Sequence, residues 1–145
     1  MGEESRERVQ FYSEEIDFEL ENEEAIIDWI LKGIKDEGSS LKRVTYVFCS
    51  DEYLYEVNMK YLNHDTYTDI ITFPMNYNPI ESDIFISIDR IKDNAKELNV
   101  SFKDELHRVI IHGVLHLIGY DDKTNEAQLL MTQKENEFLA KRLFL

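Results

Sequence analysis

The stretch HGVLHLIGYDD, residues 112–122, contains two histidines four positions apart, followed by a glycine and then two aspartates. On a helix, side chains at this spacing lie on one face with Cβ atoms about 6 Å apart, so His112 and His116 can reach one ion. Gly119 has no Cβ and can adopt a positive φ, which would turn the chain back toward the helix. The pattern H-x-x-x-H-x-x-G-x-x-D therefore predicts a metal site formed by His112, His116 and Asp122.

Two imidazoles and a carboxylate suit zinc, which binds nitrogen at about 2.0–2.1 Å and carboxylate oxygen at about 2.0–2.2 Å. Another divalent metal, such as Ni²⁺ or iron, is the alternative cation. Asp121 is the neighbouring alternative to Asp122 as the third ligand. The structural alternative is a pair of core histidines, but two of them on one apolar helix would each need a buried hydrogen-bond partner.

A third ligand placed after a glycine is similar to the arrangement in metzincin proteases. Those enzymes carry a glutamate directly after the first histidine, and it acts as the general base. Here that position is Gly113. The difference argues against a peptidase of the usual kind and leaves one with a base from elsewhere as an alternative.

Size and composition indicate one globular domain over residues 1–145, with 43% hydrophobic and 12% aromatic residues. The single cysteine, Cys49, has no partner within the chain, which favours a reducing, cytoplasmic compartment. No apolar run is long enough for a membrane span, and the charged start MGEESRERVQ lacks a signal-peptide core. A net charge of −14 works against non-specific binding to nucleic-acid phosphates.

Apolar periodicity and capping residues predict an ordered series of strands and helices. Strands are expected within 7–20, at 43–50, at 69–74 and at 83–88, with a turn over 75–82. Helices are expected at 23–37, 51–62, 89–98, 102–118 and 124–143. The expected caps are Asn22, Ser50 or Asp51, Ser101 and Thr124, with Gly119 ending the fourth helix. This order predicts an α+β domain: a mixed sheet of about four strands packed with helices, its metal site on a helix of the C-terminal half and the following loop.

Three segments together resemble the YbeY family of endoribonucleases, also called rRNA maturation factors. HGVLHLIGYDD, preceded by DELHRVIIHG, is similar to the family signature that ends in GYDH. NMKYLNHDTYTDIITFP (58–74) is similar to the family segment N-x-x-Y-R-G-K-D-x-P-T-D-V-L-S-F-P. SDIFISIDRIKDNAKEL (82–98) is similar to the family's G-D-I-x-I-S strand and the helix after it.

The resemblance implies a zinc-dependent hydrolase: a single-strand-specific endoribonuclease that acts in 16S rRNA 3′-end maturation and ribosome quality control. Its implied partners are single-stranded RNA, rRNA and the small ribosomal subunit, with no membrane and no DNA expected. A ribosome-assembly factor without catalytic activity, holding a structural metal, is the second alternative to the enzyme. The sequence assigns no catalytic base.

Two positions depart from the family pattern. Asp122 stands where the family has its third histidine, and Leu62 stands where it has an arginine. An arginine there would be expected to hold a phosphate or stabilise its developing charge, and leucine can do neither. Lys60, Asn63 and Arg108 are the candidate replacements.

Five other residues near these motifs are candidates for the site or for its surroundings. Asn58, Thr68 and Asp69 match the family segment and are expected either to line the cleft or to cap and turn the chain. His64 falls in a predicted loop. His107 lies about 140° round the helix from His112 and is expected outside the site.

Overall fold

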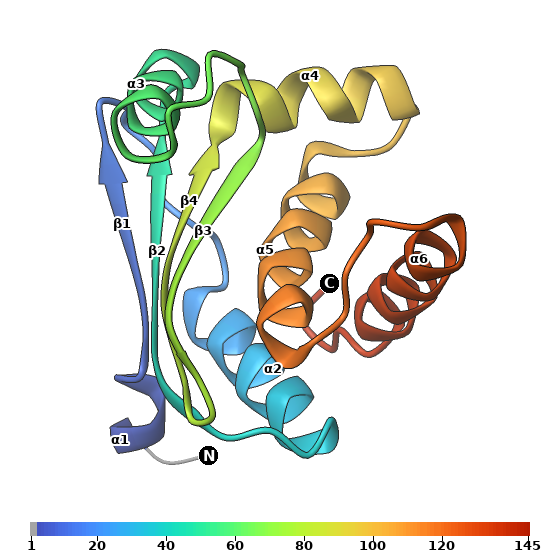
Figure 1. Cartoon of the computed structure of the whole chain (residues 1–145). Helices are drawn as coiled ribbons and strands as arrows, with labels where there is room; N and C mark the ends of the chain where they lie inside the picture. The colour runs from blue at the N-terminus through green and yellow to red at the C-terminus, as the bar shows by residue number, and fades with distance from the viewer. Residues whose placement is uncertain (1–2) are drawn as a thin grey trace.

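A four-stranded mixed sheet is the frame of the protein, whose computed structural model describes residues 3–145 (Figure 1). The elements in chain order are α1 (Glu3–Arg6), β1 (Val9–Glu14), α2 (Glu23–Asp36), β2 (Leu41–Cys49), α3 (Asp51–Leu62), β3 (Ile70–Tyr77), β4 (Ile80–Ser87), α4 (Ile88–Leu98), α5 (Phe102–Ile118) and α6 (Asn125–Ala140). The strands stand in the order β1-β2-β4-β3, with β3 antiparallel to β4 and the other neighbours parallel. The predicted α+β fold with a mixed sheet of about four strands is confirmed.

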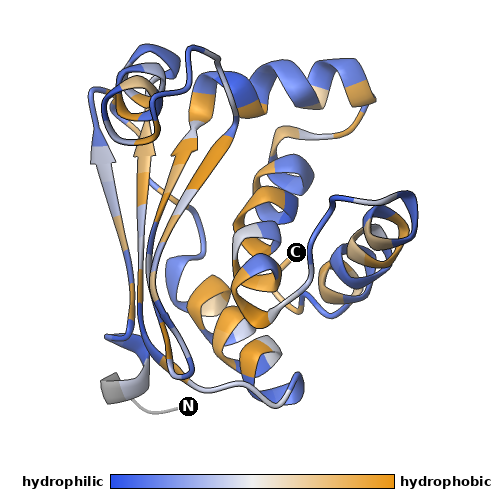
Figure 2. Cartoon of the chain, viewed as in Figure 1, coloured by the Kyte–Doolittle hydropathy of each residue, from blue (hydrophilic) through white to orange (hydrophobic). Residues whose placement is uncertain are grey.

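The main core lies between one face of the sheet and the helices α2 and α5, which cover that face (Figure 1). Alternate residues of the central strands are buried there, among them Val44, Tyr46 and Phe48 of β2. The predicted helix at 23–37 is α2, and its buried residues include Ile26, Ile27, Ile30 and Leu31. Figure 2 shows the same division, because the apolar stripes of α2 and α5 face the sheet and their polar stripes face outward.

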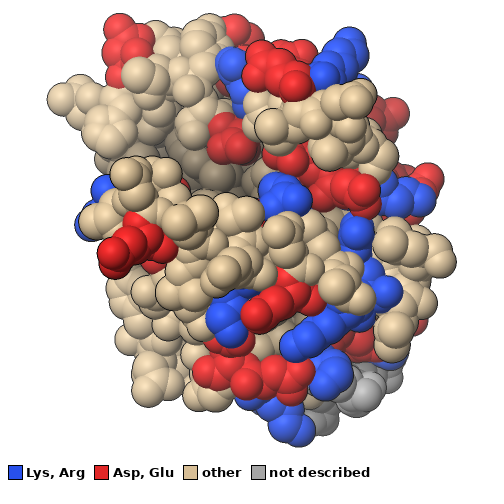
Figure 3. Space-filling model, turned by 90° about the vertical axis from the view of Figure 1, so that its right-hand side faces the viewer, with Lys and Arg blue, Asp and Glu red and all other residues tan. Residues whose placement is uncertain are grey.

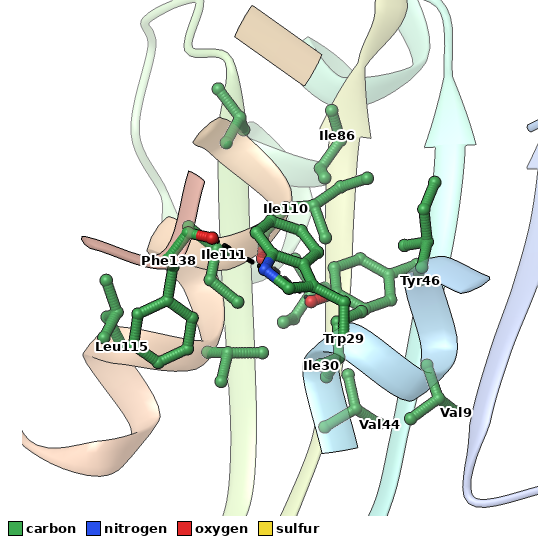
Figure 4. Close-up of a cluster of buried hydrophobic side chains, with 14 of the residues drawn as sticks. Val9, Trp29, Ile30, Val44, Tyr46, Ile86, Ile110, Ile111, Leu115 and Phe138 are labelled. Carbon is green, nitrogen blue, oxygen red and sulfur yellow. Dashed lines mark hydrogen bonds between the residues drawn. The ribbon is translucent and has the colours of Figure 1, made fainter. Parts of the chain in front are cut away.

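Two aromatic side chains hydrogen-bond across this core (Figure 4). The Trp29 indole nitrogen donates to the carbonyl of Phe138 in α6 at 2.8 Å. The Tyr46 hydroxyl donates to the carbonyl of Ile110 in α5, also at 2.8 Å. Each buried donor therefore has a partner, and each bond ties a different helix to the core.

A smaller apolar cluster lies where α3 packs against β3 and β4. Its buried members are Cys49, Leu54, Val57 and Ile71. Burial, with smaller contributions from nearby carboxylates, raises the pKa of Cys49 to about 12. Cys49 is therefore a packed thiol and not a nucleophile at neutral pH.

Three of the expected helix caps are confirmed. The side chains of Ser50, Ser101 and Thr124 each accept a hydrogen bond from the backbone N–H three residues later. The expected cap at Asn22 is wrong: α2 begins after it, but Asn22 has a left-handed backbone and its side chain makes no capping bond. That side chain instead donates to the carbonyl of Phe144 at 3.4 Å. A contact 122 residues away along the chain thus replaces a local one.

The first strand, Val9–Glu14, lies within the expected 7–20 and ends before Glu15, which has a φ of 58°. Two other element boundaries were predicted wrongly. The expected turn over 75–82 is far shorter, since strand pairing continues to Tyr77 and Ile80. Residues 76–79 are exposed hairpin positions, where Asn76 donates to the Pro79 carbonyl at 2.8 Å, whereas Ser82 is buried in β4. The last helix ends at Ala140, before the expected residue 143.

Within residues 3–145, no helix is both long and apolar enough to cross a bilayer.

His107 lies on the buried side of α5 and is only 3% exposed. Arg142 donates to its Nδ1 at 2.9 Å, and the ring contacts the rings of Trp29 and Phe144. Burial first, and then the Arg142 cation, lower the pKa of His107 to about 4, although Asp104 acts in the opposite direction. His107 is therefore a neutral structural residue, outside the predicted metal site.

The depressed pKa of His107 predicts a specific loss of stability in acid. An unfolded histidine has a pKa of about 6.5, so between that pH and about 4 the unfolded chain binds a proton that the folded chain does not. The free energy of unfolding should therefore fall by about 3 kcal/mol as the pH drops through this window. His107→Gln keeps an acceptor for Arg142 without titrating, so urea unfolding at several pH values should show a smaller drop for this variant. Parallel curves for the two proteins would contradict the assignment.

Candidate metal centre

A cavity of ≈ 430 Å³ lies between the second half of α5, the start of β3, and the loop that joins α3 to β3. His112 and His116 of α5 line it together with Asp122 of the α5–α6 loop. The facing wall comes from the end of α3 and the following loop: Asn58, Leu62, His64, Thr66, Thr68 and Asp69. The three residues predicted as ligands are therefore in one cavity, and so are five of the further residues singled out from the sequence.

The end of α5 brings Asp122 back to this cavity. Gly119 follows the last helical residue with a φ of +127°, as predicted, and its N–H bonds the carbonyls of Leu115 and His116. No atom lies within 4 Å of the place where a Cβ would stand. Glycine is therefore needed here for its backbone conformation and not for space.

The hydrogen bond of His116 fixes which ring nitrogen is free. Its Nδ1 lies 2.9 Å from the carbonyl oxygen of Tyr120. Because a carbonyl can only accept, Nδ1 carries the proton and donates it. The lone pair is then on Nε2, which is the atom left for a metal.

His112 is held between two carboxylates. Its Nδ1 lies 2.7 Å from Oε2 of Glu135, and its Nε2 lies 3.9 Å from Oδ2 of Asp122. Burial lowers the pKa of the ring, but the hydrogen bond to Glu135 and the charges of Glu135, Asp122 and Asp69 outweigh it, so the pKa of His112 is raised. The surroundings of His112 therefore favour a positive charge at this point.

The donor set fits a divalent cation, although the side chains are not drawn in to coordination distance. Two ligand atoms around a tetrahedral zinc are about 3.3 Å apart, shorter than the 3.9 Å between His112 and Asp122. In residues 3–145, no three His, Cys, Asp or Glu side chains are gathered tightly enough to hold a metal as they stand. The Asp122 side chain is 52% exposed. The three ligands stay a prediction that is consistent in chemistry and in location.

Of the two adjacent aspartates, Asp122 is the one that lines the cavity. The Asp121 carboxylate instead accepts a hydrogen bond from the backbone N–H of Lys123 at 3.1 Å. It stabilises the loop between α5 and α6 locally. The register inferred from the family signature therefore agrees with the geometry.

Gly113 faces the sheet and not the cavity. A Cβ at this position would lie 3.0 Å from Ile84 Cδ1 and 3.2 Å from Ile70 Cδ1. The residue after the first histidine is thus pressed against β3 and β4, where a catalytic glutamate has no room. This packing strengthens the argument against a metzincin-like peptidase.

None of the three suggested replacements for the family arginine lines the cavity, whereas Leu62 does. Arg108 donates to Glu135 at 2.9 Å, Lys60 lies over the ring of Tyr61, and Asn63 ends α3 in a left-handed conformation. No lysine or arginine is among the lining residues in the described part of the chain. On the face that Figure 3 shows, basic side chains are interspersed with acidic ones.

Glu135 is the functional candidate that the sequence reasoning missed. It lies on α6, 23 residues from His112, in a helix that contains two other glutamates, Glu126 and Glu137. The available signal was its spacing: the buried residues of α6 are Met131, Glu135 and Phe138, so one glutamate falls on the apolar stripe. A charged residue on a buried stripe needs a partner, and here the partners are Arg108 and His112.

Comparison with known proteins gives consistent results. Residues 8–142 match the family described as Endoribonuclease YbeY. The Endoribonuclease YbeY of Flavobacterium johnsoniae is 48% identical over 130 residues, which cover 89% of this chain and 94% of the relative. That of Cytophaga hutchinsonii is 46% identical over 140 residues, covering 95% and 98%.

A solution structure of a Thermotoga maritima protein has a TM-score of 0.66 and 24% sequence identity, covering 90% of this chain and 86% of that chain. This likeness concerns the fold. The family match and the two relatives extend over almost all of the sequence. The chain therefore belongs to the endoribonuclease YbeY family.

Proposed function

We propose that this protein is a zinc-dependent endoribonuclease that cleaves single-stranded RNA in the cytoplasm. Its role would be rRNA processing, in 16S rRNA 3′-end maturation and ribosome quality control, with the small ribosomal subunit as partner. The proposed ligands are Nε2 of His112, Nε2 of His116 and the carboxylate of Asp122. The observation that carries the proposal is that these three side chains line one cavity while the Nδ1 atoms of both rings are already hydrogen-bonded elsewhere.

When bound here, a divalent cation supplies a Lewis acid for a phosphoryl oxygen and lowers the pKa of water. Structural zinc sites are closed by four protein ligands, whereas catalytic sites use three. The proposed set of His112, His116 and Asp122 has the three ligands of a catalytic site; His64 and Asp69 also line the cavity and are assigned no metal contact in this proposal.

Asp69 is the carboxylate of the lining that is left for proton transfer. It lies just before β3, and its Oδ2 accepts a hydrogen bond from Asn94 at 3.2 Å. Burial raises the pKa of Asp69, although His112 and backbone N–H groups act against that shift. The side chain is therefore held in place and can hold a proton more readily than an exposed aspartate.

The uncharged polar residues shape the rest of the cavity. Asn58 donates through Nδ2 to the carbonyl and the hydroxyl of Thr66, at 2.9 and 3.2 Å, and so orders the loop after α3. Thr66, Thr68 and Thr72 line the same space. Phosphate and ribose oxygens would be met here by neutral donors and not by a guanidinium.

A ribosome-assembly factor without nuclease activity is the second candidate function. The observation that favours it is Leu62, since the family arginine is absent and no described cation replaces it in the lining. That function predicts a bound metal and association with small subunits, but no RNA cleavage at any metal load. Assays of cleavage at stoichiometric zinc separate the two candidates.

The acidic chain and a lining without lysine or arginine predict that RNA affinity depends only weakly on salt. Each phosphate neutralised by a lysine or arginine contributes a slope of about 0.7 to the dependence of log affinity on log salt for single strands. With at most one or two such contacts, the affinity for a single-stranded oligonucleotide should fall less than about tenfold between about 50 and 200 mM KCl. Fluorescence anisotropy with a cleavage-resistant oligonucleotide measures it. A loss of 100-fold or more would reveal a basic RNA surface that the lining does not provide.

The two adjacent aspartates provide a matched test of the ligand set. Asp122→Asn removes the proposed ligand charge, so zinc affinity should fall at least about 100-fold, more than the 10–100-fold typical of outer-shell changes, and RNA cleavage should be lost with it. Asp121→Asn retains an oxygen for the Lys123 N–H and should leave both properties near wild type. Isothermal titration with zinc and cleavage of a labelled RNA give the two readings. The opposite ranking of the variants would assign the ligand to Asp121.

Alanine substitutions at two glycines with positive φ distinguish the effect of backbone strain on stability from the effect of loop position on zinc binding. Gly119 has a φ of +127° and Gly38 a φ of +77°, and neither has an atom near the Cβ position. An alanine at either position should lower the free energy of unfolding by about 1–3 kcal/mol. Only Gly119→Ala should also weaken zinc binding, because it alone moves the loop that carries Asp122. Equal zinc affinities in the two variants would show that the bend at Gly119 does not deliver a ligand.

A further inference from the structure

We propose that Arg108 and Glu135 form a positioning relay that keeps the proton of His112 on Nδ1, so that Nε2 stays the ligand atom. This inference rests on the proposed metal site and adds two residues that act through His112. Neither contacts the metal in this account. Both are positioning residues, one on α5 and one on α6.

Each oxygen of Glu135 is committed to one partner. Oε1 accepts from an Arg108 guanidinium nitrogen at 2.9 Å, and Oε2 lies 2.7 Å from Nδ1 of His112. The Glu135 side chain is only 9% exposed, so water competes little for either oxygen. The carboxylate therefore links Arg108 and His112, which are four residues apart on α5.

The donors and acceptors of this group permit one arrangement. A guanidinium can only donate, and an ionised carboxylate can only accept. Arg108 donates to Glu135, and Nδ1 of His112 donates to the same carboxylate from the other side. When the ring is neutral, its lone pair is then on Nε2, the nitrogen that faces Asp122 across 3.9 Å.

Arg108 is itself held in position. Its Nε lies 3.7 Å from Oε1 of Glu105, one helical turn earlier, and a second nitrogen donates to Asn136 Oδ1 at 3.4 Å. Glu105 is 3% exposed, and its Oε1 has no hydrogen bond among the described residues. Glu105 on α5 and Asn136 on α6 therefore contact the Arg108 guanidinium from two different helices.

Packing alone does not explain a glutamate at position 135. The other buried residues of α6, Met131 and Phe138, are apolar, and an apolar side chain would fill the position without the desolvation cost of a carboxylate. The charge is retained beside a proposed metal ligand. That is where carboxylate–histidine–metal arrangements orient a ring and set its tautomer.

Glu135→Gln tests the relay because it changes one acceptor into a donor with almost no change in shape. Arg108 can only donate, so the amide oxygen must turn to it, and the amide NH₂ then faces Nδ1 of His112. The proton should move to Nε2, the ligand atom. Zinc affinity should fall about 10–100-fold. In metal-free protein in alkaline buffer, where the ring is neutral, ¹⁵N NMR should change from an Nδ1–H to an Nε2–H pattern for His112.

A second variant separates the relay from general damage to the helix interface. In Arg108→Met with Glu135→Gln, the amide oxygen is released and can accept from His112. The double variant should therefore recover the Nδ1–H pattern and a zinc affinity within about threefold of wild type, a coupling that independent structural losses would not produce. Glu137→Gln, on the same helix and 55% exposed at its side chain, is the matched control and should change neither reading.

The outcomes separate this inference from the proposed function. Wild type that binds zinc, together with a Glu135→Gln variant of unchanged affinity and unchanged tautomer, would overturn the relay and leave the metal site standing. Wild type that binds no zinc would overturn the proposed metal site, whereas the relay would still be judged by the NMR pattern. An Nε2–H tautomer of His112 in the wild-type, metal-free protein would overturn the relay without any variant, even if Glu135→Gln failed to fold.

Discussion

The close packing of α5 against β3 and β4 is the constraint on which the site depends. Gly113 permits it, because a Cβ there would lie 3.0 Å from Ile84. At 100° per residue, His112 and His116 are then both turned to the same side of the contact with the sheet, toward the cavity. The same rotation takes the position after the first histidine out of the cavity. One glycine thus fixes the direction of both imidazoles and removes the place where a peptidase would carry its base.

The parts of the structure that sequence could predict are those governed by local chemistry. Ser50, Ser101 and Thr124 cap helices through bonds that span three residues, and Gly119 ends α5 through its own backbone conformation. The cap that was predicted wrongly involves a distant partner. Asn22 is drawn to Phe144 at the other end of the chain, and no local pattern contains that contact.

The same distinction applies within the site. The histidines and Asp122 follow from spacing along one helix and the bend after it, so they could be named in advance. Glu135 could not, because its role depends on how α6 packs against α5. Leu62 was recognised as a departure, but only the structure shows that neither Lys60 nor Arg108 takes the place of the arginine. What remains is a cavity of carboxylates, imidazoles and neutral donors, in which a bound cation would be the main positive charge available to a phosphate.

X-ray diffraction from zinc-soaked crystals, with anomalous data at the zinc edge, tests the central claim most directly. The account predicts one strong peak in this cavity, about 2.0–2.2 Å from Nε2 of His112, Nε2 of His116 and one oxygen of Asp122. A peak bound through Nδ1 of either ring, coordination by Asp121 in place of Asp122, or a cavity without zinc at saturating metal would contradict it.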